Sequence, residues 1–480
     1  MTLSTAQRDR ACGALLATAA GCALGAPYEF RPPRGPELEV AMVGGGGFGW
    51  EPGEWTDDTA MAIAIAEVAA TDKDLRDESA QDAIVARWHG WAQSAKDVGV
   101  QTRSVLGAAG RQGITAARAR TESEKLHRGT GRTAGNGSLM RTAPVALAYL
   151  DDEDALAEAA RAVSELTHYD PEAGDACVLW CCAIRHAVCT GALDIRVGLS
   201  HIDVARRALW STRLDEAESS RPSDFANNGW VVAALQSAWS AIATTGVPVE
   251  DPAAGVLRAD HLRLGLDAAV RAGNDTDTVA AIAGGLLGAT YGASAVPARW
   301  RRLLHGWPGI TARRLVALAD AIGRGGRREH FDYTGWSGTD TLVRHPHDDG
   351  MWIGGVGALR SLPDGVDAVV SACRVPDGDL PRDVEQVDVR LIDSDAPADN
   401  PNLEFVLLDT IRLVEQLRHE GRTVFLHCVQ AQRRTPAVAA LYGARKRGIG
   451  VEQAFRDVCA VLPGARPNPA FRDGLKLLHP

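Results

Sequence analysis

The sequence lacks an excess of basic residues, a long uninterrupted apolar run and any cysteine pair with the spacing of a metal site. Its 51 lysines and arginines are outnumbered by 61 aspartates and glutamates, which gives a formal net charge of −10. Such an acidic chain is not expected to bind nucleic acid or an anionic membrane through broad charge attraction. The apolar run at residues 11–24 is short and interrupted by glycine, so it predicts a buried helix and no membrane span.

The sequence also has no basic and then apolar signal at its N-terminus. Its nine cysteines are an odd number, and four of them, Cys177, Cys181, Cys182 and Cys189, fall on one apolar helical stretch. This placement predicts reduced thiols in a hydrophobic core. Reduced thiols without a signal predict a cytoplasmic protein.

At 480 residues the chain is too long for one hydrophobic core, so more than one domain is expected. Residues 1–325 carry recurrent Ala-rich amphipathic runs and predict an all-α domain. Residues 326–339 predict a Gly-rich linker. In residues 340–480 short β-like runs alternate with helical ones, which predicts an α/β domain with a mostly parallel sheet. The expected strands are 351–353, 368–372, 387–392 and 424–427, and the expected helices are 402–419, 435–447 and 451–461.

Two acidic clusters stand far apart in the helical part of the sequence. They are Trp55-Thr56-Asp57-Asp58-Thr59 and Asn274-Asp275-Thr276-Asp277-Thr278. Each combines hydroxyl and carboxylate oxygens, which are the ligands that Mg²⁺ prefers. Both also precede an Ala-rich helical run, where the same residues serve as helix caps. If the fold brings the two clusters together, they would form a site for two metal ions.

Three further features accompany these clusters. Glu29 follows the first predicted helix, Gly135-Asn136-Gly137-Ser138 forms a small-residue turn, and His168 follows another helix. The bare amides of the turn would suit a diphosphate. Taken one at a time, each feature also has an ordinary structural explanation, because glycines end helices and Gly-Asn-Gly forms turns.

In this order and on a helical frame, the five features resemble the ADP-ribosylglycohydrolase family over residues 5–325. The resemblance implies an all-α fold, a pair of Mg²⁺ or Mn²⁺ ions, and hydrolysis of an ADP-ribosyl bond to a protein or a small molecule. It implies Glu29 as the glutamate of a flexible loop. The metal ligands that it implies are Thr56, Asp57, Asp58, Asp275, Asp277 and Thr278. The ADP-ribose contacts that it implies are Gly135, Asn136, Gly137, Ser138 and His168.

Cleavage at the ribose carbon passes through an oxocarbenium-like state. Metal ions would orient the ribose hydroxyls and lower the pKa of a bound water. A neighbouring carboxylate, Asp57 or Glu29, would then exchange a proton with the water or the leaving group. The sequence leaves both residues open as this catalytic group.

A second constellation lies near the end of the chain. Cys428 and Arg434 are separated by five residues, between a predicted strand and a predicted helix. A loop of this length can wrap its amides around a phosphate, and the helix N-terminus favours the thiolate. Arg434 would hold two phosphate oxygens. The pattern therefore predicts phosphate chemistry that differs from that of the acidic clusters.

This second constellation resembles the dual-specificity group of cysteine phosphatases over residues 340–475. The resemblance implies that Cys428 is the nucleophile, that Arg434 binds phosphate and that Thr435 eases loss of the thiolate. It also implies Asp393 as the general acid, with Asp395 and Asp399 as nearby alternatives.

One departure concerns the phosphate loop, where the family's glycine is Ala431. If that position needs a positive φ, alanine strains the loop and weakens catalysis. We therefore expect a bifunctional enzyme with an ADP-ribosylated substrate and a phosphorylated substrate. One alternative is a non-catalytic phosphate-recognition domain beside the hydrolase. The other is two-step processing of a phosphorylated ADP-ribose metabolite.

Overall fold

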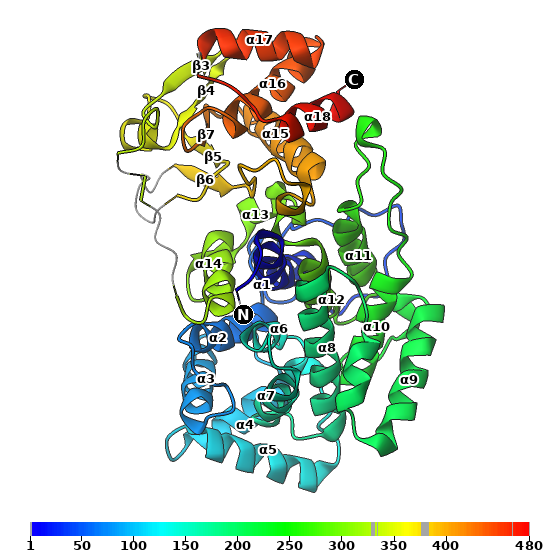
Figure 1. The fold of residues 1–480 in the computed structure, drawn as a ribbon. Coiled ribbons are helices and arrows are strands. Elements are labelled where there is room, and N and C mark those ends of the chain that lie inside the picture. Colours follow the sequence, from blue (N-terminus) through cyan, green and yellow to red (C-terminus); the bar gives the residue numbers. More distant parts are fainter. Residues whose placement is uncertain (1, 328–331, 334, 376–383, 463, 480) are drawn as a thin grey trace. The chain divides into compact units, whose positions relative to one another are not determined.

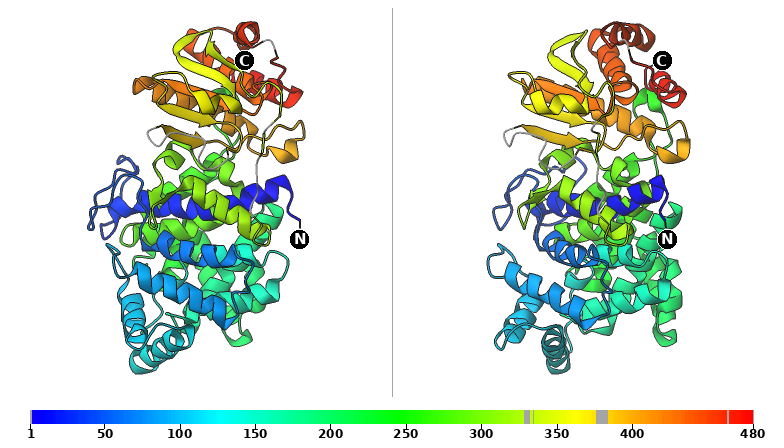
Figure 2. Two further views of the ribbon diagram at one scale, coloured as in Figure 1. Left: turned by 90° about the vertical axis from the view of Figure 1, so that its left-hand side faces the viewer. Right: turned by 60° about the vertical axis from the view of Figure 1, so that its left-hand side comes forward.

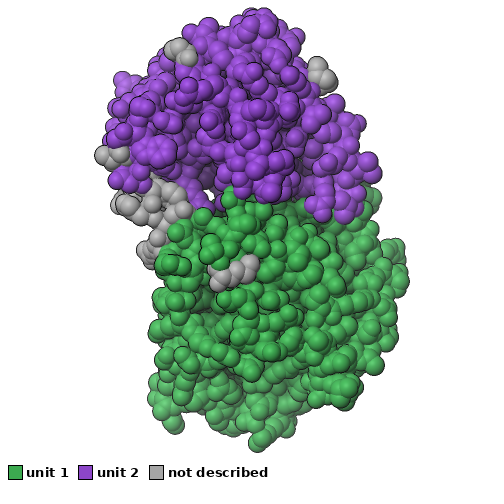
Figure 3. Space-filling view, in the orientation of Figure 1, with its two compact units in different colours: residues 1–246, 261–296, 303–328 green, residues 247–260, 297–302, 329–480 purple. Residues whose placement is uncertain are grey.

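The computed structural model describes residues 2–327, 332–333, 335–375, 384–462 and 464–479 (Figures 1 and 2). The chain divides into two compact units, which Figure 3 shows in different colours. Unit 1 comprises Met1–Gly246, His261–Val296 and Leu303–Arg328. Unit 2 comprises Val247–Asp260, Pro297–Arg302 and Glu329–Pro480.

Unit 1 confirms the predicted helical fold. Apart from the two-residue strands β1 (His305–Gly306) and β2 (Ile310–Thr311), its regular elements among the described residues are helices. The α-helices are α1 (Thr5–Gly25), α2 (Asp57–Ala69), α3 (Glu78–Trp91), α4 (Val100–Gly110), α5 (Ala116–Thr130), α6 (Ala143–Ala148), α7 (Glu153–Glu165), α8 (Pro171–Thr190), α9 (Val204–Ser219), α10 (Val231–Ala243), α11 (Asp260–Arg271), α12 (Thr276–Tyr291) and α14 (Ala312–Gly323).

Helix α1 is the central helix of unit 1 and packs along α12 (Figures 1 and 2). The two helices approach closely because glycines face the opposite backbone. A Cβ at Gly284 would overlap the backbone of Ala17, and one at Gly288 would overlap that of Gly13. The end of α1 also supports the start of α12, since the Thr276 hydroxyl donates to the Gly25 carbonyl over 2.9 Å.

The expectation that no apolar stretch reaches the length of a membrane span was wrong for this helix. Residues Thr5–Tyr28 are long and apolar enough to cross a membrane, but the apolar window is completely buried within the protein. A helix that is apolar on all sides is also typical of the centre of a globular unit. The packing of α1 against α12 therefore accounts for its composition.

Unit 2 contains a five-stranded sheet with the order β3-β4-β7-β5-β6. The strands β4 (Asp348–Gly355), β7 (Val424–Cys428), β5 (Ala368–Ser371) and β6 (Glu385–Asp388) are parallel, and β3 (Leu342–His345) is antiparallel to β4. The mostly parallel sheet confirms the predicted α/β class. The strand predicted at 387–392 is wrong after Asp388, because the chain leaves the sheet there. The helices of this unit are α13 (Ala298–Leu303, whose last residue belongs to unit 1), α15 (Leu403–His419), α16 (Arg434–Arg447), α17 (Val451–Val461) and α18 (Pro469–Leu478).

Two short segments from the helical part of the sequence belong to unit 2. The sequence analysis instead expected one boundary between the domains, at the linker. Polar contacts explain the placement of the second segment. The Ala298 amide donates to the Asp409 carboxylate over 2.8 Å, and Arg302 pairs with Glu385 and Glu420. Of the predicted linker, residues 328–331 and 334 lie outside the described residues.

The close packing of α1 and α12 predicts an asymmetric response to Gly→Ala substitutions. Gly284→Ala places a methyl group against the backbone of α1 and should lower the free energy of unfolding by about 3 kcal/mol. Gly90→Ala is the matched control, since a Cβ on this exposed residue of α3 meets no atom within 4 Å. It should leave stability unchanged or raise it by about 0.5–1 kcal/mol. Urea unfolding followed by circular dichroism measures both, and equal effects would contradict the packing argument.

Candidate functional site

The two acidic clusters meet in unit 1, where α2 and α12 begin. The Thr56 hydroxyl donates to Asp58 Oδ2 over 2.6 Å and lies 3.0 Å from Asp277 Oδ2, so it joins the two clusters directly. Thr56 is the N-cap residue of α2, but its side chain makes no capping hydrogen bond. The hydroxyl therefore serves the acidic site, and simple capping does not explain the first cluster.

The meeting clusters form two groups of three carboxylates that share one residue. One group is Asp57, Asp58 and Asp277, and the other is Glu29, Asp275 and Asp277. Within each group the nearest ligand atoms lie within 4.8 Å of one another. This arrangement has the donor set and the spacing for two hard divalent cations, with Asp277 between them.

The electrostatics of the site also favour cations. Burial raises the pKa of all five carboxyl groups, and in most of them neighbouring carboxylates raise it further. Among the described residues, Glu29 Oε2, Asp58 Oδ1 and Asp277 Oδ1 are buried and have no hydrogen-bond partner. Buried carboxylates normally have a partner. The residues therefore fit a pair of metal ions.

Polar neighbours hold these carboxylates in place, and all of them except Asn136 were missed by sequence reasoning. The Asn136 side chain donates to Asp275 Oδ2 over 2.7 Å, and Asn228 Oδ1 accepts from the Asp275 amide over 3.1 Å. The Cys22 thiol donates to Asp58 Oδ2 over 3.3 Å. Asp97 adds a negative charge that raises the pKa of Glu29 and Asp57. Only the Asn-Gly turn after Asn228 offered any signal in the sequence.

The Gly-Asn-Gly turn lies against His168, as its sequence position allowed. A Cβ at Gly137 would lie 3.0 Å from the ring carbon Cε1 of His168, and one at Gly135 would lie 3.3 Å from Nε2. The ring is 2% exposed, and burial lowers its pKa well below the usual value, so it is neutral. The expectation of bare amides was wrong at Asn136, whose amide donates to the Gly229 carbonyl. Ser138 is buried and faces Cys177.

A strained contact positions Glu29 and Asp275. Phe30 and Asn274, the residues beside them in sequence, both have a φ of 60°. Phe30 donates its amide to the Asn274 carbonyl over 2.6 Å, and the Asn274 amide donates to Arg31 over 2.7 Å. A left-handed phenylalanine is costly and persists only where surrounding contacts hold it. The strain thus fixes two carboxylates that lie far apart in the sequence.

The second predicted site lies within unit 2 at the carboxyl end of β7. Cys428 ends this strand, and α16 begins at Arg434. Ligands of parallel sheets usually bind at this edge. Here a pocket of about 450 Å³ is lined by Tyr333, Trp336, Asp393, Cys428, Val429, Gln430, Gln432, Arg433 and Arg434. Tyr333 and Trp336, from the segment predicted as a linker, pack edge to face at 5.8 Å.

Most of the predicted phosphate-site residues converge on this pocket. Arg434 Nη1 donates to the carbonyls of Ala372 and Leu391, whereas its buried Nε has no hydrogen-bond partner among the described residues. Asp393 lines the pocket 3.3 Å from Arg433, and Asp399 instead accepts a hydrogen bond from Ser394. The Thr435 hydroxyl donates to the Gly354 carbonyl over 3.3 Å.

The loop position that departs from the phosphatase pattern has the backbone that favours glycine. Ala431 has a φ of 56°, in the left-handed region. An L-residue pays about 1–2 kcal/mol there. The sequence analysis expected strain if position 431 has a positive φ. The structure confirms this backbone angle.

Unit 1 combines a helical fold with clustered buried carboxylates, and comparisons with known proteins identify its family. The sequence model described as ADP-ribosylglycohydrolase matches residues 3–330. The chain belongs to the ADP-ribosylglycohydrolase family.

Individual relatives agree with this assignment. "ADP-ribosylarginine hydrolase Tri1" of Pseudomonas putida is 31% identical over 298 residues, covering 61% of this chain and 73% of the relative. "ADP-ribosyl-[dinitrogen reductase] glycohydrolase" of Rhodospirillum rubrum is 29% identical and covers 61% and 89%. A solved "ADP-ribosylglycohydrolase-related protein complex" has a TM-score of 0.50 at 29% identity, covering 68% of this chain and all of the other.

Unit 2 has shorter similarities. Human "Protein phosphatase Slingshot homolog 3" is 30% identical over 109 residues, which is 23% of this chain and 16% of that protein. This match covers only a small part of each protein, so the activity of unit 2 is left as a proposal.

The raised pKa values of the acidic site predict an unusual dependence of stability on pH. The pKa of Asp58 rises from 3.8 to about 6, and that of Glu29 rises from 4.5 to about 9. Because the fold disfavours the ionised forms, their contribution to stability is present below about pH 4 and is lost as the pH rises through these values. The melting temperature of chelator-treated protein should therefore fall between about pH 5 and about pH 8.

Asp277→Asn removes the carboxylate that the two groups share and should bring the pKa values of the other carboxyl groups closer to their usual values. The melting temperature of this variant should therefore fall less as the pH rises. Asp215→Asn, in a solvent-exposed ion pair with Arg196, is the control and should keep the wild-type pH dependence. Melting curves of the three proteins over the pH range decide the question. Parallel curves for wild type and Asp277→Asn would contradict the electrostatic account.

Ala431→Gly should relieve the strain in the phosphate loop and raise the free energy of unfolding by about 1 kcal/mol. Ala437→Gly, inside α16, is the matched control and should lower it by about 1 kcal/mol. Chemical denaturation measures both changes. A loss of stability in Ala431→Gly would show that the loop does not store this strain.

Proposed function

We propose that unit 1 hydrolyses the bond between ADP-ribose and an arginine side chain. The observation that carries the proposal is the pair of carboxylate groups that share Asp277. Membership of the ADP-ribosylglycohydrolase family supports the reaction class. The arginine linkage rests on the relative that is named an ADP-ribosylarginine hydrolase. The substrate would be an ADP-ribosylated protein, or a small molecule with the same bond.

We propose that two Mg²⁺ or Mn²⁺ ions are held by the acidic site. The fit rests on buried carboxylate oxygens without a partner among the described residues and on the oxygen-only donor set. Bound ions would orient the ribose hydroxyls and lower the pKa of a coordinated water. Thr56 and Thr278 contribute hydroxyls to the same cluster, and Thr56 already bonds to Asp58 and Asp277.

Asp57 is the better placed of the two carboxyl groups that the sequence left open for proton transfer. It is partly exposed, whereas Glu29 is only 8% exposed. Burial and the neighbouring Asp58 raise the pKa of Asp57, so this carboxyl group holds a proton more readily than an exposed aspartate does. Glu29 would instead complete the metal site.

The turn around Gly137 would hold the diphosphate of ADP-ribose. The backbone at Gly135 and Gly137 packs on the neutral His168 ring, so a side chain at either position would displace it. His168 therefore packs against the turn and supports it. Binding energy gained at the diphosphate would fix the ribose over the carboxylates.

For unit 2 we propose hydrolysis of a phosphomonoester through a Cys428 thiolate. The unpartnered Nε of Arg434 is available to the phosphate, and Asp393 lines the same pocket as Cys428. In this reading Cys428 attacks phosphorus, Asp393 protonates the leaving oxygen, and Thr435 assists loss of the thiolate in the second step. The substrate would be a phosphorylated protein or metabolite.

A second candidate for unit 2 is phosphate recognition without catalysis. Two observations favour it: the strained backbone at Ala431, and the Thr435 hydroxyl, which donates to the Gly354 carbonyl. Such a module would bring the hydrolase to a phosphorylated partner. The alternative for two active units is that they process one phosphorylated ADP-ribose metabolite in two steps. We place the protein in the cytoplasm, consistent with nine free cysteines.

Two substitutions should separate the two chemistries in the intact chain. Asp277→Asn should lower kcat/KM for ADP-ribose release from ADP-ribosylarginine by about a hundredfold or more, because the shared ligand is lost. It should leave phosphate release unchanged. Cys428→Ser should abolish phosphate release and leave ADP-ribose release unchanged, and a chelator should act like Asp277→Asn.

The assays are ADP-ribose release and phosphate release from aryl phosphates, phosphopeptides and ADP-ribose phosphates. Phosphate binding without turnover in wild type would replace the phosphatase proposal with recognition. Full ADP-ribose release by Asp277→Asn in the presence of chelator would refute the metal-dependent mechanism.

A further inference from the structure

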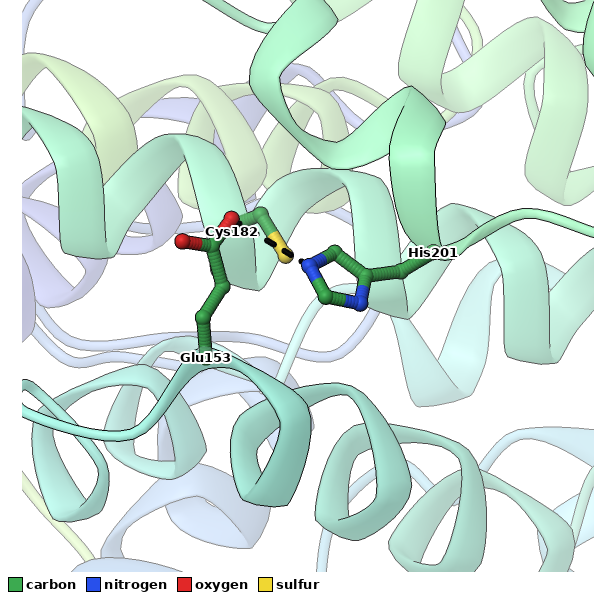
Figure 4. A group of neighbouring side chains, drawn as sticks. All are labelled: Glu153, Cys182 and His201. Atoms are coloured by element: carbon green, nitrogen blue, oxygen red, sulfur yellow. Dashed lines mark ion pairs between the residues drawn. The ribbon is translucent and has the colours of Figure 1, made fainter.

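A third group of metal-type ligands in unit 1 shares no residue with the two acidic groups. Glu153 is the first residue of α7, Cys182 is on α8, and His201 ends the short helix η3 (Arg196–His201). Their ligand atoms all lie within 4.8 Å of one another. Figure 4 shows the three side chains pointing toward one another from these separate elements.

Neighbouring charged side chains hold two members of the group in place. His201 Nε2 lies 3.3 Å from Glu153 Oε1, while the other carboxylate oxygen of Glu153 pairs with Arg185 over 2.9 Å. The other ring nitrogen of His201 lies 3.6 Å from Asp154. A histidine between a carboxylate and a central position has the usual arrangement of a metal ligand with its outer partner.

The thiol completes an asymmetric donor set. Cys182 is 1% exposed and, among the described residues, makes no hydrogen bond. The close approach of η3 to α8 depends on Gly198, where a Cβ would lie 2.9 Å from Leu179 Cα and 3.2 Å from Cys182 Cβ. The fold thus brings the imidazole to the buried sulfur, while the side chains of Glu153 and His201 remain 35% and 18% exposed.

We propose that Glu153, Cys182 and His201 bind a Zn²⁺ ion, with water as the fourth ligand. Sulfur, nitrogen and oxygen donors together favour Zn²⁺ over the hard cations that suit the all-oxygen acidic site. Ligands of a tetrahedral Zn²⁺ lie roughly 3.3–3.8 Å apart, so side-chain shifts of about 1 Å close the site. Binding releases the thiol proton and links α7, α8 and η3.

A plain ion pair between Glu153 and protonated His201 is the competing explanation. It would need no thiol, whereas a metal site would. The spectrum of Co²⁺, a substitute for Zn²⁺, therefore distinguishes them, because a bound thiolate produces an intense near-ultraviolet charge-transfer band. Carboxylate and water ligands in the acidic site do not produce it.

The test is a Co²⁺ titration of the chelator-treated full chain, followed by Zn²⁺ competition. Wild type should show the thiolate band, and Zn²⁺ should remove it. Cys182→Ser should lose the band, His201→Gln should lose or greatly weaken it, and Asp154→Asn should weaken Co²⁺ binding by about tenfold. His186→Gln, a histidine on the same helix α8, is the matched control and should behave like wild type.

Two further controls cover the other candidate thiolates. Cys22 lies beside the acidic site and Cys428 lies in the pocket of unit 2, so Cys22→Ser and Cys428→Ser should both keep the band. Zn²⁺ should also raise the melting temperature of wild type but not of Cys182→Ser. Absence of the band in wild type, its persistence in Cys182→Ser, or its loss in either control would overturn the proposal.

Discussion

The site of unit 1 depends on holding like charges together in a buried place. Asp57, Asp58 and Asp277 repel one another there, and burial makes each charge more costly. An isolated group of this kind would move apart. The fold prevents this by starting α2 and α12 at the same place and by packing α12 tightly against α1. The helical scaffold therefore holds the carboxylates together despite their mutual repulsion.

Local strain adds to this arrangement where the helices alone do not suffice. Glu29 is in the turn after α1, and its position depends on the left-handed backbone of Phe30 and on two hydrogen bonds with Asn274 and Arg31. Energy stored in this contact is compensated by the surrounding packing. The same principle applies at Ala431 in unit 2, where the loop has a left-handed backbone that alanine does not favour.

The proposed zinc site differs from the acidic site in its donor atoms and in the role that we propose for it. One site offers only oxygen donors and lies where the substrate would bind. The other offers sulfur, nitrogen and oxygen donors. It would link α7, α8 and η3, which no disulfide joins. Most protein sites bind the divalent transition metals in the same order of affinity. A protein with both sites would therefore select each ion by the type of ligand that the site offers.

The sequence by itself determined much of the fold and the candidate site. The period of the apolar residues indicated the helical unit, and the alternation of strands and helices indicated the α/β unit, because both patterns are local. The pairing of hydroxyls with carboxylates around Asp57 and Asp277, and the spacing of Cys428 and Arg434, were equally local signals. A resemblance to a known family gave these motifs their expected roles.

Only the tertiary structure decided which residues meet. Asn228 and Cys22 reach the acidic site through folding alone, and Tyr333 reaches the phosphate pocket from a segment that looked like a linker. Cys182 looked like an ordinary core thiol until η3 brought His201 beside it. These contacts join residues distant in sequence, and no local pattern encodes such distances. The backbone angle at Ala431 likewise follows from the loop as a whole.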